Sequence, residues 1–255
     1  MSETNSTSTT SPSSTTNNRH MKRTLYTLIS LFLLISCQQE DVLTETGKGY
    51  LQLESLTLGS VTAENIVTRA VEEDLYIKIS NGTDADKVYA PGEFPQTKVE
   101  LNAGSYTLEA YNEAYLTTGA DDPRYYARTT FSIEPEKVSY IDLQVPMINV
   151  GISLAPFSDE LTALFSNPKL TVYTTDSGAT KALDPGQTTY FDHTDNMTFT
   201  YTLTATNTDN ETFTTTPQTY GNNDGQSVEP GHCYILSYSL AGTRLQAACT
   251  ATASR

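Results

Sequence analysis

From residue 49 onward, short runs of alternating apolar and polar residues dominate the chain. Residues 74–80 place Leu75, Ile77 and Ile79 on one face, and Asn81-Gly82 then supplies a turn signal. A period of two is that of a strand with one buried face. Similar runs lie at residues 49–60, 99–111, 131–133, 141–145, 148–154, 170–172, 199–205 and 233–240. The pattern predicts an all-β protein.

The first of these runs contains an irregularity. Leu51 and Leu53 share one parity, and Leu56 and Leu58 share the other. A one-residue shift of this kind is typical of a β-bulge within a continuous strand.

The spacing of strands and turn residues predicts β-sandwiches. Pro146 closes one series of strands and a new strand opens directly after it, so we expect domains at 49–146 and 147–255. In the second domain, Ser158 followed by two acidic residues and then by Leu161 and Leu164 predicts one short helix that ends before Asn167-Pro168.

The last fifteen residues, 241–255, depart from this pattern. They show little alternation, and Leu245 is their single large apolar residue. We expect a C-terminal end that is truncated or altered, which is the interpretation we favour. The alternative is a second sandwich that lacks its last strand and presents an open edge.

An apolar run at residues 25–37 follows Lys22-Arg23 and ends at Cys37. A basic segment, a short apolar segment and a small residue before the cut are the parts of a secretory signal peptide. The run is shorter than the roughly 20 residues that cross a bilayer. Its end resembles a bacterial lipoprotein signal, which predicts lipidation at Cys37. The alternatives are an ordinary signal peptide with an incidental cysteine, or a buried helix.

Residues 1–20 are rich in Ser, Thr and Asn and hold almost no apolar residues, so we expect them to be disordered. They precede the basic segment where signal peptides begin, so Met21 is the expected start of translation. A glycosylated stalk is the alternative. Residues 1–36 would then be removed, and residues 37–48 would form a lipid-anchored tether.

The charge balance narrows the choice of partners. The whole chain has a formal net charge of −15, and removal of residues 1–36 makes it more acidic by two units. Such a chain repels nucleic acid, which we exclude as a partner. Apart from Cys37, the cysteines are Cys233 and Cys249, which either pair with each other or stay as free thiols.

The sequence carries no HExxH, GxSxG, P-loop or CxxC motif. His232 adjoins Cys233 in a predicted strand, where neighbouring side chains point to opposite faces, so a Cys-His dyad is disfavoured. We therefore predict a protein that is not an enzyme, with no cofactor and no metal.

One long polar connection, at residues 116–126, is the candidate ligand loop because long loops on sandwiches often carry function. Its candidate residues are Asp121, Asp122, Tyr125 and Tyr126. Asp121-Asp122 is better explained as a solvated turn than as a calcium site, and the same holds for Asp84 and Asp86.

Several short motifs together carry a family resemblance. They are GYLQL at 49–53, Thr68-Arg69-Ala70, the strand at 74–80, AGSYTL at 103–108 and INV at 148–150. With the lipoprotein signal, they resemble the DUF4493 lipoproteins of Bacteroides, which look related to the fimbrillin-like pilins and adhesins of Bacteroidetes. The resemblance implies two tandem transthyretin-like Greek-key β-sandwiches and a pilus subunit or cell-adhesion protein on the outer face of the outer membrane.

In such pilins an arginine-specific protease cuts behind the first strand, and a donor strand from another subunit fills the groove. The resemblance places Arg69 at that cut, although Arg69 can also be an ordinary loop arginine of an uncut anchor. Outer-membrane lipid, held through Cys37, and a host or glycan ligand are the other expected partners. The alternative function is a glycan-binding lipoprotein of a polysaccharide-uptake system, with Tyr125 and Tyr126 as stacking platforms.

Overall fold

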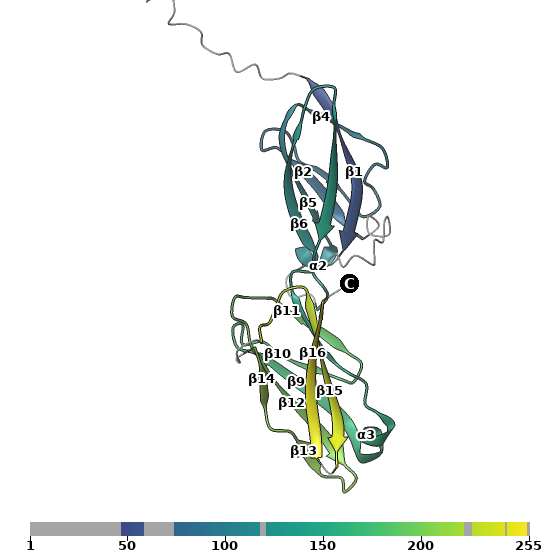
Figure 1. Ribbon diagram of the computed structural model, residues 1–255, viewed down its shortest axis with the longest axis vertical. Helices are drawn as coiled ribbons and strands as arrows, with labels where there is room; N and C mark the ends of the chain where they lie inside the picture. Colours follow the sequence, from purple (N-terminus) through teal and green to yellow (C-terminus); the bar gives the residue numbers. More distant parts are fainter. Residues whose placement is uncertain (1–46, 59–73, 118–120, 222–225, 243, 254–255) are drawn as a thin grey trace, which may run out of the picture. The chain divides into compact units, whose positions relative to one another are not determined.

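The computed structural model describes residues 47–58, 74–117, 121–221, 226–242 and 244–253. The first series of elements is β1 (Lys48–Leu58), β2 (Tyr76–Ser80), β3 (Lys87–Tyr89), β4 (Val99–Asn102), β5 (Gly104–Tyr111), α2 (Glu113–Leu116), β6 (Tyr126–Ile133) and β7 (Val138–Val145). The second is β8 (Val150–Leu154), α3 (Asp159–Leu164), β9 (Phe165–Thr174), β10 (Thr180–Leu183), β11 (Thr188–Phe191), β12 (Phe199–Asn207), β13 (Thr212–Thr214), β14 (Gln218–Tyr220), β15 (His232–Ala241) and β16 (Arg244–Ala253). The predicted all-β class is confirmed (Figure 1).

Strands β1 to β7 form two sheets, β4-β1-β7 and β3-β2-β5-β6, which we call the first sandwich. Their inner faces share one apolar cluster. Leu51 of β1 and Val145 of β7 enter it from one sheet, and Ile77 of β2 and Leu108 of β5 enter it from the other. All four side chains are almost fully buried, so the alternation in the sequence identified the inner face correctly.

Strands β8 to β16 form the second sandwich, with sheets β11-β8-β15-β16 and β10-β9-β12-β13, and β14 also pairs with β12. A separate apolar cluster fills it. On β12, Phe199 and Leu203 are buried while Thr200 and Thr202 lie on the other face. The long alternation at residues 199–205 therefore marks a strand with one buried face, as predicted.

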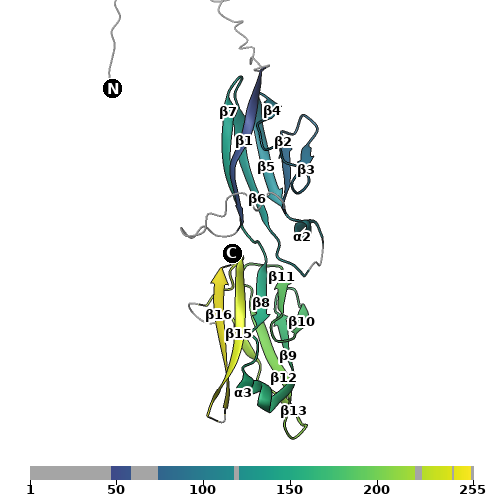
Figure 2. The same cartoon turned by 90° about the vertical axis from the view of Figure 1, so that its right-hand side faces the viewer.

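The two sandwiches share one strand topology. β1 pairs parallel with β7 and antiparallel with β4, and β8 pairs in the same way with β15 and β11. The opposite sheets also correspond, since β3-β2-β5 matches β10-β9-β12 in order. Among the described strands, β16 has no counterpart in the first sandwich, and it lies at a sheet edge (Figure 2).

Strand β16 contradicts the alternative that the second sandwich lacks its last strand, while a truncated or altered end stays a prediction. It pairs with β15 over ten residues, from Arg244 opposite Ala241 to Ala253 opposite His232. Leu245, Ala247 and Cys249 face the second cluster. The alternation is present, but small residues carry it, and alanine and cysteine contribute too little apolar area for the period to stand out.

The predicted short helix is α3. The Ser158 side chain accepts a hydrogen bond from the Leu161 amide at 3.3 Å, as an N-cap should. α3 ends at Leu164, and Phe165 already begins β9. The sequence predicted one short helix, but the structure has a second, the four-residue α2, which follows β5.

By contact density, residues 45–255 form one compact unit. The division at 146/147 therefore stays a prediction, although each sandwich has its own apolar cluster.

Candidate functional site

Two predicted site residues, Cys37 and Arg69, lie outside the described residues. Of the described elements, β1 (Lys48–Leu58) lies between them in sequence. β1 thus links the predicted lipid anchor to the predicted cut.

β1 is the middle strand of its sheet (Figure 2). Leu51 lies opposite Val99 of β4 on one side and Ser139 of β7 on the other. The register against β7 shifts between Leu53 and Ser55, which confirms the predicted bulge. Loss of β1 would leave both neighbouring strands with unpaired backbone groups.

The side chains of β1 are also part of the core. Leu51 is fully buried and Leu56 nearly so, and both belong to the first cluster. At Gly49, a Cβ atom would lie 2.2 Å from the Glu134 carbonyl oxygen, so only glycine fits where β1 crosses the end of β6. The glycine of the GYLQL motif is therefore explained by close backbone packing.

Asp121, from the predicted ligand loop, contacts the second sandwich. Its carboxylate accepts a bifurcated hydrogen bond from the Thr189 hydroxyl, 2.8 and 2.9 Å from its two oxygens. It also accepts from the Tyr190 amide at 2.7 Å and from Lys181 Nζ at 3.0 Å. Burial acts to raise the pKa of Asp121. The hydrogen bonds and the Lys181 charge outweigh it, so the pKa lies below its ordinary value.

The next residues of this loop meet Asn149, which is buried just before β8. Asn149 donates to the Asp122 carbonyl at 2.9 Å and accepts from the Arg124 amide at 3.0 Å. The Arg124 guanidinium forms an ion pair with Asp192 and donates to the Thr117 carbonyl at 3.3 Å. The loop therefore connects strands of both sandwiches.

Tyr125 and Tyr126 are half-buried rather than freely exposed. Tyr125 forms an antiparallel bridge with Met147. The Tyr126 hydroxyl donates to Glu109 at 2.7 Å, and its ring stacks on Tyr115 with centroids 4.6 Å apart. The hydrogen bond to Glu109 is the main cause that raises the pKa of Tyr126 to about 12. A ligand role for these two residues stays a prediction.

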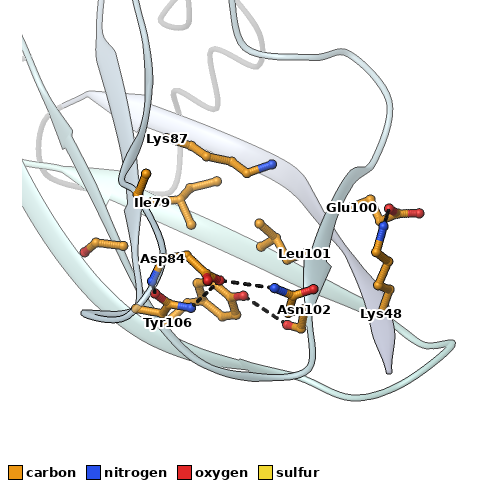
Figure 3. A pocket seen from close by; sticks show the side chains of 11 residues that line it. Lys48, Ile79, Asp84, Lys87, Glu100, Leu101, Asn102 and Tyr106 are labelled. Carbon is orange, nitrogen blue, oxygen red and sulfur yellow. Dashed lines mark hydrogen bonds and ion pairs between the residues drawn. The ribbon is translucent and has the colours of Figure 1, made fainter. Parts of the chain in front are cut away.

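A polar cavity of about 190 Å³ opens between the sheets of the first sandwich (Figure 3). Asp84 Oδ2 accepts from Asn81 at 2.9 Å and from Asn102 at 3.2 Å, and so ties the β2–β3 loop to β4. The Tyr106 hydroxyl donates to the Asn102 carbonyl at 3.0 Å. From the sequence, Asn81-Gly82 indicated a turn and Asp84 and Asp86 a solvated turn, but the contact with Asn102 could not be seen because Asn102 is distant along the chain.

Asp86 has a different partner from Asp84. It forms an ion pair with Lys78 at 2.9 Å, on the outer face of β2. Among the described residues, no three His, Cys, Asp or Glu side chains come together as a metal-binding group.

Both Cys233 and Cys249 are free thiols. Cys249 lies opposite Leu236 on β15, three positions from Cys233, so the two side chains point to opposite faces of the sheet. Burial raises the pKa of both thiols, that of Cys249 to about 11. Of the two alternatives left open by the sequence, the structure shows unpaired thiols.

The two histidines of the second sandwich form hydrogen bonds with backbone carbonyl oxygens. His193 Nε2 lies 2.9 Å from the Val228 carbonyl, and His232 Nδ1 lies 3.2 Å from the Pro230 carbonyl.

Within the part of the chain that the structure describes, the helices are all too short or too polar to cross a membrane.

The sequence model of a domain of unknown function, DUF4493, matches residues 47–251. The chain belongs to this family. The predicted resemblance is therefore confirmed, and the DUF4493 match spans both sandwiches. A comparison with curated proteins finds no match.

Solved structures similar to this DUF4493 chain come from species of Bacteroides, Parabacteroides and Porphyromonas. A fimbrial assembly protein from Parabacteroides distasonis is 11% identical, covers 81% of this chain and 98% of its own, and has a TM-score of 0.45. A candidate cell adhesion protein from Bacteroides uniformis is 12% identical, with 81% and 99% covered and a TM-score of 0.44. The tip fimbrial protein Mfa3 from Porphyromonas gingivalis is 7% identical, with 81% and 99% covered and a TM-score of 0.39.

Proposed function

We propose that this DUF4493 protein is a non-enzymatic lipoprotein of the cell surface that acts as a fimbrillin-like pilus subunit or cell-adhesion protein. The names of the three solved structures agree with this proposal. The observation that carries it is the placement of β1 in the middle of its sheet.

A central strand close to the N-terminus suits strand exchange. A cut after Arg69 would leave β1 attached to the first sandwich only through hydrogen bonds and side-chain packing. Its release would expose the edges of β4 and β7 together with the apolar space that Leu51 and Leu56 fill. A strand from another subunit would satisfy both the backbone groups and this space.

The lipid anchor is the second part of the proposal. Cys37, modified with more than one acyl chain, would hold the protein at the outer membrane, because two chains anchor stably where one does not. The acidic residues Glu40 and Asp41, shortly after Cys37, resemble the tag that sends lipoproteins of Bacteroides to the outer face of the outer membrane, and they support a position outside the cell.

Fractionation of cells that express the full chain or its Cys37→Ala variant tests this anchor. We expect the full chain in the outer-membrane fraction and accessible to protease added to intact cells. The Cys37→Ala variant should leave that fraction. A full chain that stays in soluble fractions would contradict the proposed anchor.

A further inference from the structure

The polar cavity of the first sandwich holds donors and acceptors that the fold itself does not use. Asp84 Oδ1 and Asn102 Oδ1 accept no hydrogen bond from any described residue, and the Ser80 hydroxyl is likewise unused there. The Lys87 ammonium group has neither a hydrogen bond nor an ion pair within the described ranges. Figure 3 shows Lys87 extending from β3 across the cavity.

We propose that this cavity binds one pyranose ring of a neutral glycan. A sugar hydroxyl both donates and accepts, so neighbouring hydroxyls can satisfy carboxylate, amide and ammonium groups in one small space. Asp84 Oδ1 and Asn102 Oδ1 would accept from hydroxyls, while Lys87 and Ser80 would donate to hydroxyl or ring oxygens.

The apolar part of the lining fits the same ligand. Ile79 of β2 and Leu101 of β4 line the cavity from its two sheets, and a sugar ring presents C–H groups as well as hydroxyls. The cavity volume of about 190 Å³ lies below the roughly 300 Å³ at which pockets for drug-sized molecules begin. It therefore suits a single ring, with the rest of the glycan outside.

Other ligand classes match the side chains less well. A phosphate or sulfate ion supplies acceptors for Lys87 but is repelled by Asp84, and a metal ion is repelled by Lys87. A free amino acid can pair with the charges of Asp84 and Lys87. Its side chain would then lie against Ser80 and Asn102 and would not satisfy their hydrogen-bonding groups. A neutral polyol can form hydrogen bonds with Ser80, Asp84, Lys87 and Asn102. It brings no charge of its own into the cavity.

If the protein is an adhesin, a glycan would be the class of partner that it binds. This biological role of the site rests on the proposed function. The binding itself is a property of the first sandwich. If the experiment below shows no glycan binding, the glycan site is refuted. The proposed lipid anchor at Cys37 and the proposed cleavage at Arg69 are tested separately and would still stand.

Titration of ¹⁵N-labelled residues 38–255 with methyl pyranosides tests the site, since this segment contains the whole of the compact unit 45–255. The methyl glycosides of glucose, galactose, mannose and N-acetylglucosamine are the probes, with free alanine and inorganic phosphate as competing classes. We expect at least one glycoside to shift amide signals of residues 79–87 and 100–106.

Lys87→Ala is the diagnostic variant because the exposed Lys87 side chain forms no hydrogen bond or ion pair with any described residue. We expect it to weaken glycoside binding about tenfold, which corresponds to about 1.4 kcal/mol. Lys98→Ala is the matched control, because the Lys98 ammonium lies over the Tyr50 ring, 3.9 Å from its centroid, outside the cavity lining. It should leave binding unchanged, and the amide spectrum reports whether each variant is folded.

Three results would overturn the proposal. The first is the absence of any shift with all four glycosides. The second is equal binding by the unaltered chain and by folded Lys87→Ala. The third is a response of these residues to alanine or phosphate but not to a glycoside, which would assign the cavity to another ligand class.

Discussion

The Asp121 carboxylate accepts a bifurcated hydrogen bond from the Thr189 hydroxyl at 2.8 and 2.9 Å, although the two residues belong to different sandwiches and lie 68 positions apart. The Tyr190 amide and Lys181 complete the set of donors. A loop that the sequence indicated as a ligand site thus also connects the two halves of the fold.

Asp121→Ala should lower the free energy of unfolding at neutral pH. Hydrogen bonds to a charged group contribute about 1.5–3 kcal/mol, and solvent at this half-exposed side chain reduces that, so we expect a loss of about 1 kcal/mol. Asp122→Ala is the control, because Asp122 contributes its backbone carbonyl to Asn149. Urea unfolding of the three proteins measures the difference, and equal losses in both variants would contradict this role of Asp121.

The same interaction should depend on pH. The folded pKa of Asp121 lies below its ordinary value of 3.8, so its contribution is complete above that value. It is lost as the pH falls through the lowered folded pKa. The stability difference between the unaltered chain and Asp121→Ala should therefore shrink below about pH 4. A difference that grows in acid would mean that the carboxylate is destabilising.

The inner face of β16 can be tested with two adjacent alanines. Ala247 packs against the second cluster, while Ala248 is exposed on the opposite face. Ala247→Asp should destabilise the protein by about 1–3 kcal/mol because it pushes an unpaired charge against the core. Ala248→Asp should stay within about 0.5 kcal/mol. Similar effects on thermal unfolding would indicate that β16 is not packed as described.

The two thiols should be slow to alkylate at pH 8 in the folded protein, because burial raises their pKa values and the thiolate is the reactive form. Denaturation should make both react, as mass spectrometry would show. Under oxidising conditions Cys233 and Cys249 should form no intramolecular disulfide. Thr252→Cys, which places a thiol directly opposite Cys233, is the positive control. Efficient Cys233–Cys249 pairing would require a different register.

Several strands with large apolar residues could be predicted from the sequence. In β2, Ile77 and Ile79 alternate with polar residues and are buried, and in β1 the change of parity after Leu53 marks the observed bulge. β16 was not predicted because the inward-facing positions of its alternating pattern include the small residues Ala247 and Cys249. The apolar signal depends on side-chain area, and small side chains supply little of it.

The polar sites could not be predicted in the same way. Asp84 meets Asn102 eighteen positions away, and Asp121 meets Thr189 much farther along the chain. These contacts arise only when strands pair and sheets pack. Local sequence showed turn residues at both places, but it contained no information on which distant groups would face them.

The most direct test of the account is brief arginine-specific proteolysis of residues 38–255, followed by N-terminal sequencing and measurement of mass by light scattering. Arg69→Lys is the matched control, since it keeps the charge and removes the cleavage site. A synthetic peptide with the β1 sequence, KGYLQLESLTL, tests whether the opened groove can be filled again.

We predict selective cleavage after Arg69, a product that begins at Ala70 and forms oligomers, and suppression of those oligomers by the β1 peptide. Arg69→Lys should remain intact and monomeric. Resistance of Arg69 to cleavage, or a cleaved product that stays monomeric, would contradict assembly by strand exchange and leave an uncut anchor or adhesin as the function of the protein.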